Sequence, residues 1–500
     1  MSRLGAVELL ELVVDPDSFQ RWDTEPLPPR GVHGEPEQSY HDELAAARER
    51  SGVDESVITG EAAIEGRRVA IIMCEFRFLA GSIGVAAAER LTLGIERATA
   101  EGLPLLAVPA SGGTRMQEGT VAFLQMVKIS AAIAAHKAAG LAYVVYLRHP
   151  TTGGVMASWG SLGHVTAAEP GALLGFLGPR VYQALYGEEF PPDVQTAENL
   201  AARGLIDAVV APAELRRIAA DALAVLCAPR EAPPAVPNLP LEQLPDVPAW
   251  ESIQRSRNPA RPGVRALLKV AANTVTPLQG TGAGEQEPGL LLALAKFGPA
   301  ACVVLGQDRK FADQPLGPAG LREARRGMRL AAGLGLPLVT VIDTAGAALS
   351  KDAEEGGLAG EIARCLVELT TLAAPTICLL LGEGAGGGAL ALLPADRVLC
   401  AQHAWLSPLP PEGASAIRFH TTDRADEMAA AQGVRSLDLL RNGIVDRIVA
   451  EHPDAADEPA EFLSRLGGVL EHELAMLLTR TPTDLRTARL DRYRRLGVAT

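Results

Sequence analysis

Two glycine pairs are the residues of this chain best suited to chemistry. Gly153-Gly154 and Gly387-Gly388 each begin six positions after a strongly apolar run, which ends at Leu147 in the first half and at Leu381 in the second. A buried strand that leads through paired glycines into a helix leaves backbone N–H groups uncovered, because no Cβ blocks the approach of a ligand. Such groups can stabilise a developing oxyanion. Two of these devices in equivalent places indicate two carbonyl compounds that are activated together.

Each glycine pair has a companion loop after the preceding apolar run. Gly112-Gly113 lies in the loop after the run that begins at Leu105, and Gly346-Ala347 follows the run that begins at Leu338. Loops after adjacent parallel strands meet at the carboxyl edge of the sheet, where ligands bind. One N–H from each loop would form a two-donor hole, and losing one donor costs about 3–4 kcal/mol of transition-state stabilisation. One glycine pair alone could merely permit a tight turn, but four loops in matched positions favour the catalytic interpretation.

Other chemical motifs are weaker. The chain has no P-loop, no dinucleotide fingerprint that opens a first βαβ unit, and no metal-ligand spacing among its histidines. Glu118, Glu383 and Glu412 are candidate acids, yet none has a carboxylate or histidine partner at a characteristic spacing. Arg115 could pair with a phosphate, with a carboxylate at a domain interface, or within a structural salt bridge. A chemistry whose base is supplied by a cofactor therefore fits better than a catalytic triad.

Apolar runs recur along both halves of the chain at nearly constant spacing. They begin at Val69, Leu105 and Ala142 in the first half and at Ala301, Leu338 and Thr376 in the second. The gaps are 36 and 37 residues in the first half and 37 and 38 in the second, with helical patterns between the runs. Short apolar runs joined by helices are typical of βαβ crossovers in a largely parallel sheet. The sequence therefore predicts an α/β protein with two similar domains in tandem.

Composition divides the chain into four predicted segments. Residues 229–249 are rich in proline and poor in periodic apolar positions, which predicts a semi-rigid linker. This linker separates a first domain, residues 40–228, from a second domain, residues 250–500. Residues 1–39 are predicted to be an N-terminal arm. The arginine-rich stretch 480–495 has the composition of a solvated helix, which could serve as an interaction tail.

Overall composition excludes several classes of partner. The net charge of −14 argues against general nucleic-acid binding and against docking on an anionic membrane. No stretch of about 18 uncharged, strongly apolar residues occurs, and the N-terminus lacks the organisation of a signal peptide. The six cysteines contain no C-x-x-C pair, so reduced structural thiols are expected. We expect a cytoplasmic protein with no membrane span.

The glycine loops closely resemble motifs of the bacterial acetyl-CoA carboxylase carboxyltransferase. Motifs similar to its β subunit occur at 111–118, 150–155 and 175–180. Motifs similar to its α subunit occur at 250–255, 342–347, 382–390 and 411–415. The resemblance covers most of residues 60–490, with the motifs of both subunits in order. The chain looks like a natural β–α fusion of the kind found in biotin-dependent acyl-CoA carboxylases.

This resemblance implies a fold and a reaction. The fold is a tandem pair of crotonase-like domains, each a ββα superhelix. The reaction is an ATP-independent half-reaction that moves a carboxyl group from carboxybiotin to the α-carbon of an acyl-CoA, with acetyl-CoA giving malonyl-CoA for fatty acid biosynthesis as the first expectation. After carboxybiotin releases CO₂, the biotin enolate would take the α-proton of the thioester. The chain has no biotin-attachment triplet, so a biotin carboxyl carrier protein would act in trans and a biotin carboxylase subunit would load it.

The resemblance also assigns roles to residues. Gly153-Gly154 would hold the acyl-CoA thioester oxygen, with Gly112-Gly113 beside them. Gly387-Gly388, with Gly346-Ala347, would hold the ureido oxygen of biotin, and Arg115 belongs with the substrate-binding residues. The active site is expected where the first domain of one subunit faces the second domain of another, so at least a homodimer is expected.

The chain departs from the family pattern at three places. No zinc-ribbon cysteines precede Cys74, so no zinc is expected. Ala345 stands where the family usually has proline, and Leu349-Ser350 where it has proline and glycine.

Two other functions stay open: a decarboxylase of malonyl or methylmalonyl thioesters on the same fold, and a weakly active scaffold paralogue in a carboxylase complex.

Overall fold

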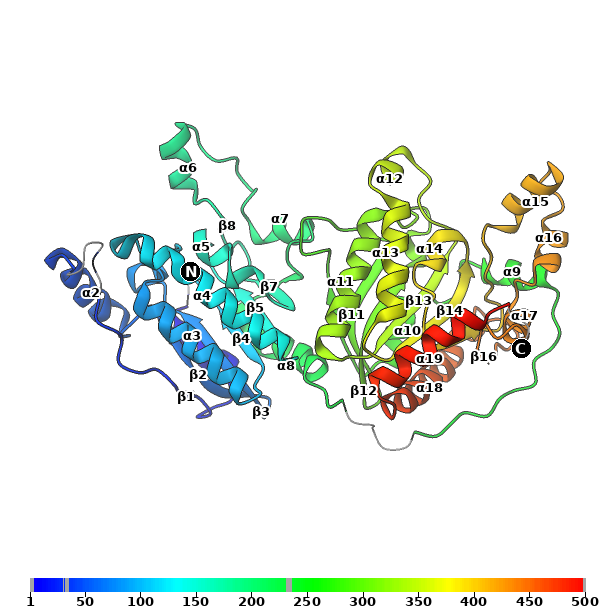
Figure 1. Cartoon of the computed structure of the whole chain (residues 1–500), viewed down its shortest axis with the longest axis horizontal. Helices are drawn as coiled ribbons and strands as arrows, with labels where there is room; N and C mark the ends of the chain where they lie inside the picture. Colours follow the sequence, from blue (N-terminus) through cyan, green and yellow to red (C-terminus); the bar gives the residue numbers. More distant parts are fainter. Residues whose placement is uncertain (1–3, 30, 32–35, 231–235, 498–500) are drawn as a thin grey trace. The chain divides into compact units, whose positions relative to one another are not determined.

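The computed structural model describes residues 4–29, 31, 36–230 and 236–497, which form two compact units (Figure 1). The first unit comprises Met1–Cys227 with Gly282–Gly284, and the second comprises Ala228–Thr281 with Glu285–Thr500. Residues 231–235 of the predicted linker lie outside the described residues, as do residues 1–3, 30 and 32–35 of the predicted arm and residues 498–500 of the predicted second domain.

A seven-stranded sheet forms the centre of each unit. The first sheet has the order β1 (Gln20–Arg21), β2 (Val57–Ile64), β3 (Arg67–Cys74), β4 (Leu105–Val108), β5 (Tyr143–Leu147), β7 (Val165–Ala168) and β9 (Ala208–Val209). The second has the order β10 (Thr274–Leu278), β11 (Leu290–Phe297), β12 (Ala300–Gln307), β13 (Leu338–Thr344), β14 (Thr376–Gly384), β15 (Arg397–Ala401) and β16 (Arg447–Val449). The first three strands of each sheet pair antiparallel and the others parallel. The predicted α/β class with two similar halves is confirmed.

Helices connect and cover the strands. Those of the first unit are α1 (Ala6–Val13), α2 (Gln38–Ser51), α3 (Val85–Ala100), α4 (Gly119–Ala138), α5 (Gly153–Met156), α6 (Pro179–Tyr186), α7 (Ala197–Ala202) and α8 (Leu215–Leu226). Those of the second are α9 (Ala249–Ser256), α10 (Val264–Ala271), α11 (Pro318–Leu334), α12 (Lys351–Glu355), α13 (Leu358–Thr371), α14 (Gly386–Leu390), α15 (Pro411–Phe419), α16 (Ala425–Gln432), α17 (Ser436–Arg441), α18 (Pro459–Leu478) and α19 (Pro482–Arg495).

Periodic apolar residues explain the main crossover helices. Both α3 and α11 contain buried apolar residues three or four positions apart, because one stripe of each helix faces its sheet; these are Ala87, Leu91, Ile95 and Ala98 in α3 and Leu321, Ala324, Met328, Ala331 and Leu334 in α11. Helix α4 packs beside α3 and helix α13 beside α11 (Figure 1). Each pair therefore connects the strands whose carboxyl ends carry the glycine loops.

The ends of the described chain are packed against their own units. Within the predicted N-terminal arm, helix α1 buries Ala6, Leu9, Leu10 and Val13. At the other end, the predicted solvated helix is present as α19, but its Leu485 and Arg489 are buried. Spacings of three and four residues place each buried set on one helix face. The C-terminal helix is therefore a docked element of the second unit rather than a fully solvated one.

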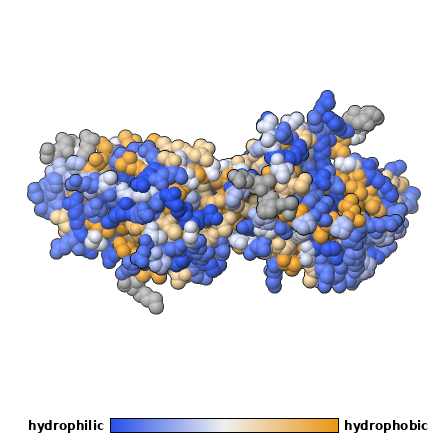
Figure 2. Space-filling view, turned by 90° about the horizontal axis from the view of Figure 1, so that it is seen from below, coloured by the Kyte–Doolittle hydropathy of each residue, from blue (hydrophilic) through white to orange (hydrophobic). Residues whose placement is uncertain are grey.

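The surface combines hydrophilic and apolar regions. On the face seen in Figure 2, hydrophilic residues cover most of each unit and apolar residues form smaller patches between them. Among the residues that the structure describes, one helix, Met116–Ala138, is long and apolar enough by length and composition to cross a membrane, although the sequence predicts no membrane span. A single helix of this kind is weak evidence for a span, because helices of soluble proteins pass the same test.

Candidate active site

The two predicted glycine loops of the first unit are in contact. Ser111 and Thr151 form a parallel bridge between the segments that follow β4 and β5. A Cβ built on Gly113 would lie 3.4 Å from both the Gly153 Cα and the Gly154 nitrogen, so the loops touch backbone to backbone. Gly113 and Gly153 have φ values of +109° and +61°, which favour glycine. The structure therefore brings together the residues that the sequence predicts for the oxyanion hole of the first domain.

Hydrogen bonds distinguish the N–H groups of these loops. The N–H of Gly112 donates to the Ala80 carbonyl at 2.9 Å, and that of Gly113 to the Ser111 hydroxyl at 3.0 Å. The Gly153 N–H donates to the Phe176 carbonyl at 2.9 Å. Gly154 lies in the first turn of α5, where N–H groups have no intrahelical acceptor. Gly154 is thus the predicted glycine best placed to donate to a ligand.

A second donor comes from a residue that the sequence analysis did not select. The Arg115 N–H donates to the Ile83 carbonyl at 3.0 Å. Because successive N–H groups of an extended segment point to opposite sides, the Thr114 N–H points away from Ile83. The Thr114 hydroxyl would lie 3.2 Å from a Cβ built on Gly154, so Thr114 adjoins that glycine. Thr114 and Gly154 form the candidate donor pair of the first unit.

The second unit repeats this arrangement. The Gly346 N–H donates to the Thr344 hydroxyl at 3.1 Å, and the Gly386 N–H donates to the Ser407 carbonyl at 2.9 Å. The Ala348 N–H donates to the Leu316 carbonyl at 3.0 Å, so the Ala347 N–H points to the opposite side. The N–H of Gly387 lies in the first turn of α14. Ala347 and Gly387 form the candidate donor pair of the second unit.

The strand registers align the two halves and shift the second glycine pair by one residue. Thr152 donates its N–H to the Ser111 carbonyl, as Ala385 does to the Thr344 carbonyl. Gly386-Gly387 therefore correspond to Gly153-Gly154, although the sequence analysis equated Gly387-Gly388 with that pair. Gly388 instead lies against the neighbouring loop, since a Cβ built on it would be 3.2 Å from the Ala347 nitrogen.

Arg115 lies in the interior of the first unit rather than at a ligand site. Its side chain is 1% exposed, and one guanidinium nitrogen donates to Glu55 Oε2 at 2.9 Å. A second guanidinium nitrogen donates to the Ser82 carbonyl at 2.8 Å. These contacts match the salt-bridge alternative, and they leave the guanidinium group no exposed surface for a CoA phosphate.

Replacing Arg115 with lysine is expected to lower the free energy of unfolding by about 1–3 kcal/mol, because an ammonium group cannot reproduce the forked hydrogen bonds. The KM for acyl-CoA should change less than twofold. Urea unfolding and steady-state kinetics of the same preparation measure both effects. A large rise of KM with unchanged stability would instead support the substrate-binding role.

The three candidate acids are all paired. Glu118 accepts hydrogen bonds from the Tyr40 hydroxyl and the Val85 N–H, both at 2.6 Å. Glu383 and Glu412 both accept from Arg257, at 2.9 and 2.6 Å, and the hydrogen bond from Arg257 lowers the pKa of Glu412. These contacts agree with a reaction whose base is not a side chain of this chain.

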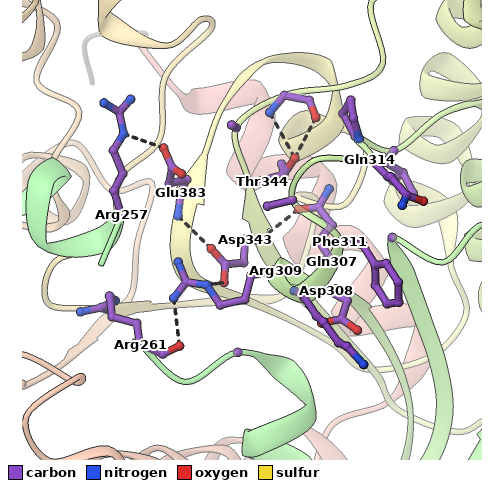
Figure 3. A pocket seen from close by; sticks show the side chains of 18 of the residues that line it. Arg257, Arg261, Gln307, Asp308, Arg309, Phe311, Gln314, Asp343, Thr344 and Glu383 are labelled. Carbon is purple, nitrogen blue, oxygen red and sulfur yellow. Dashed lines mark hydrogen bonds and ion pairs between the residues drawn. The ribbon is translucent and has the colours of Figure 1, made fainter. Parts of the chain in front are cut away.

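A cavity of about 900 Å³ opens beside the Gly346-Ala347 loop (Figure 3). Asp343 and Gln307 line it, together with Arg309. Burial raises the pKa of Asp343 to about 6, against the opposing effect of Arg309, whose Nε lies 3.3 Å from Asp343 Oδ2. Within the described ranges, no group of three or more histidine, cysteine, aspartate or glutamate side chains is arranged to hold a metal ion. The lining includes Ala347, one of the two candidate donors of the second unit, so the cavity offers space for a polar carbonyl compound beside that residue.

Known proteins resemble this chain over almost its whole length. The model of the carboxyl transferase domain family matches residues 3–486. A probable biotin-dependent acyl-coenzyme A carboxylase beta3 subunit of Mycobacterium tuberculosis is 60% identical over 500 residues, covering 100% of this chain and 99% of the relative. The acetyl-coenzyme A carboxylase carboxyl transferase subunits beta/alpha of Salinispora arenicola are 39% identical over 525 residues, covering 100% of this chain and 91% of the relative.

A solved structure shares the fold. Transcarboxylase 12S, crystallised as a hexamer with methylmalonyl-coenzyme A and methylmalonic acid bound, superposes with a TM-score of 0.72. The match covers 93% of this chain and 89% of the transcarboxylase at 22% sequence identity. The tandem crotonase-like fold expected from the sequence is confirmed.

Proposed function

Because this chain belongs to the carboxyl transferase family, as the carboxyltransferase subunit of a biotin-dependent acyl-CoA carboxylase, we propose that its substrate is acetyl-CoA and its product malonyl-CoA. The Salinispora relative, which carries acetyl-CoA carboxylase in its name, supports this choice. Propionyl-CoA is the second candidate, since transcarboxylase 12S holds methylmalonyl-CoA. The product would then supply fatty acid biosynthesis in the cytoplasm.

The two donor pairs support a division of labour between the predicted domains, residues 40–228 and 250–500. The N–H groups of Thr114 and Gly154 would hold the thioester oxygen of acyl-CoA while its α-carbon gains negative charge. Those of Ala347 and Gly387 would hold the ureido oxygen of biotin, and the cavity that Ala347 lines offers space for that group. Each main-chain donor would contribute about 3 kcal/mol to transition-state stabilisation.

Biotin, presented on its carrier protein, would supply the transferable carboxyl group and the base. The chain's own residues would orient both carbonyl compounds and stabilise their negative charge. The paired state of Glu118, Glu383 and Glu412 supports this division, because none of them is available as an unpaired carboxylate. The proposed partners are a biotin carboxyl carrier protein and a biotin carboxylase subunit.

The decisive assay is the reverse reaction, in which malonyl-CoA carboxylates free biotin. Product formation by the purified chain would support carboxyltransferase activity on this substrate, and parallel assays with methylmalonyl-CoA would rank the two acyl groups. Release of CO₂ without any biotin acceptor would favour the decarboxylase. No turnover, with the carrier and carboxylase still bound, would favour the scaffold paralogue.

An apolar face on α4 supports the proposed homo-oligomer. Val121, Phe123, Leu124 and Val127 project from it with exposed fractions of 44–67%. Exposed apolar side chains gathered on one helix face are typical of protein interfaces. We propose that a second copy of the chain covers this face.

Replacing Phe123 with aspartate is expected to shift the protein toward monomers, because the charge would lose its hydration on burial in the interface. Light scattering after size-exclusion chromatography measures the molar mass. Val270→Asp in α10 is the matched control, since Val270 is 47% exposed outside this face. An unchanged mass for the Phe123 variant would contradict the proposed role of α4.

A further inference from the structure

One buried side chain ties together the two loops of the second donor pair. Gln307 is the last residue of β12 and is 2% exposed. Its Nε2 donates to the Gly388 carbonyl at 2.8 Å, and its Oε1 accepts the Asp343 N–H at 3.1 Å. Asp343 lies near the end of the strand that leads to Ala347, and Gly388 follows Gly387 in α14. The carboxamide of Gln307 therefore bridges the segments that carry both donors.

The first unit has no such bridge at the corresponding place. Cys74 ends β3 as Gln307 ends β12, and the two residues occupy the same register in their hairpins, opposite Val57 and Leu290. The Cys74 sulfur interacts with the backbone of Ala110, the counterpart of Asp343, and burial raises the pKa of this thiol to about 12. The Cys74 thiol fills the end of β3 without a carboxamide, so packing at this place does not by itself require a glutamine. The bridge belongs to the second unit.

The bridge continues into β14 through the Asp343 carboxylate (Figure 3). Asp343 Oδ1 accepts the Glu383 N–H at 3.2 Å, and Oδ2 lies 3.3 Å from Arg309 Nε. Arg309 in turn donates to the Ser256 and Arg261 carbonyls at 2.9 and 3.2 Å. Gln307 thus belongs to this polar network and connects it to α14 through the Gly388 carbonyl.

We propose that Gln307 is a positioning residue that holds the Ala347 and Gly387 N–H groups at the separation needed by the ureido oxygen of biotin. Both ends of its carboxamide are hydrogen-bonded, and buried hydrogen bonds of this kind favour one arrangement of the groups that they join. The loops meet closely, with a Cβ built on Gly388 only 3.2 Å from the Ala347 nitrogen, so a small displacement changes the donor spacing. This inference rests on the proposed function of the second unit as the biotin side.

The test uses the full-length chain in the assay of malonyl-CoA-dependent carboxylation of free biotin. Gln307→Met keeps the volume of the side chain and removes both hydrogen bonds. We expect the KM for biotin to rise about tenfold, because small misplacements of binding groups are costly, while the KM for malonyl-CoA stays within twofold. A purely structural role would lower the active fraction, and with it kcat, without changing either KM.

Gln307→Glu gives a second signature. A protonated glutamic acid can donate to the Gly388 carbonyl and accept from the Asp343 N–H. An ionised one cannot donate, and it adds negative charge beside Asp343, a carboxylate on which Arg309, Arg261 and Glu383 already act electrostatically. The kcat/KM for biotin, relative to the unmodified chain at the same pH, should therefore recover by severalfold as the pH falls. Gln307→Met should show no such recovery.

Thr376→Val is the matched control. Thr376 is 2% exposed, and its hydroxyl donates to Asp396 at 3.0 Å at the start of β14, away from the donor pair. This variant also loses a buried hydrogen bond, yet both KM values should be unchanged. If the unmodified chain is active and the Gln307→Met variant has the same KM for biotin, the positioning role alone would be overturned. An inactive unmodified chain would overturn the proposed function and this inference with it.

Discussion

Replacing Gly388 with alanine is expected to lower kcat for carboxyl transfer by about 10²- to 10³-fold, the loss that follows removal of one oxyanion donor. The new methyl group would lie 3.2 Å from the Ala347 nitrogen and equally close to the carbonyl carbon and oxygen of Gly346. All three atoms belong to the backbone, which cannot rotate aside as a side chain can. The methyl group would therefore displace the Ala347 N–H or cover it.

The control for this variant is Gly333→Ala. Gly333 lies in helix α11, and a Cβ built there meets no atom within 4 Å, so alanine should leave kcat unchanged and stabilise the helix by up to about 1 kcal/mol. Steady-state rates of the reverse reaction, with circular dichroism to verify folding, compare the two variants. A Gly388→Ala protein with normal kcat would refute the role of this loop contact.

Replacing Arg489 with methionine is expected to lower the free energy of unfolding of the second unit by about 3–5 kcal/mol, because the buried Asp396 carboxylate loses its cationic partner. The Arg489 side chain is 0% exposed and lies 2.7 Å from Asp396 Oδ2. It also donates to the carbonyls of Leu369, Leu372 and Ala374, at 2.7–3.1 Å. This one guanidinium group joins α19 to the end of α13 and to the loop before β14.

Hydrogen exchange of peptides from β14 and β15 during urea titration measures this loss in the second unit by itself. Arg486→Met, at an exposed position of the same helix, removes the same charge and should change the unfolding free energy by less than about 0.5 kcal/mol. If both variants were equally stable, α19 would be a surface helix whose arginines contribute little to the fold.

The strands could be predicted from the sequence because their apolar runs are long and regularly spaced. The one-residue shift between the predicted and observed positions of the second glycine pair has a physical reason. The Leu105 N–H donates to the Ala142 carbonyl, whereas the Leu338 N–H donates to the Pro375 carbonyl. The Pro375 carbonyl can accept this hydrogen bond, but proline is not typical of the start of a strand. The apolar pattern therefore predicts that the second run begins at Thr376, one residue later.

The residues that tune the site could not be found from the sequence. The choice of Thr114 over Gly113 depends on which N–H groups are already bonded, and that becomes visible only when the loops are folded. Gln307 and Gly388 are joined across 81 positions, and Arg489 and Asp396 across 93, with no periodic pattern to announce either contact. Arg115 likewise follows a glycine loop, as a ligand-binding residue could, but its side chain is buried in the interior of the first unit.

Because both proposed donor pairs are made by the main chain, an ordinary alanine scan would leave their N–H groups in place. Thr114→Ala would keep its amide, and Ala347 would not be mutated at all. If the proposed roles hold, variation of the Thr114 side chain would reshape the wall around the acyl thioester, and variation of the Ala347 side chain the wall around biotin, while both amides stay in place. Thr114 is therefore the natural starting point for directed evolution toward new acyl thioesters.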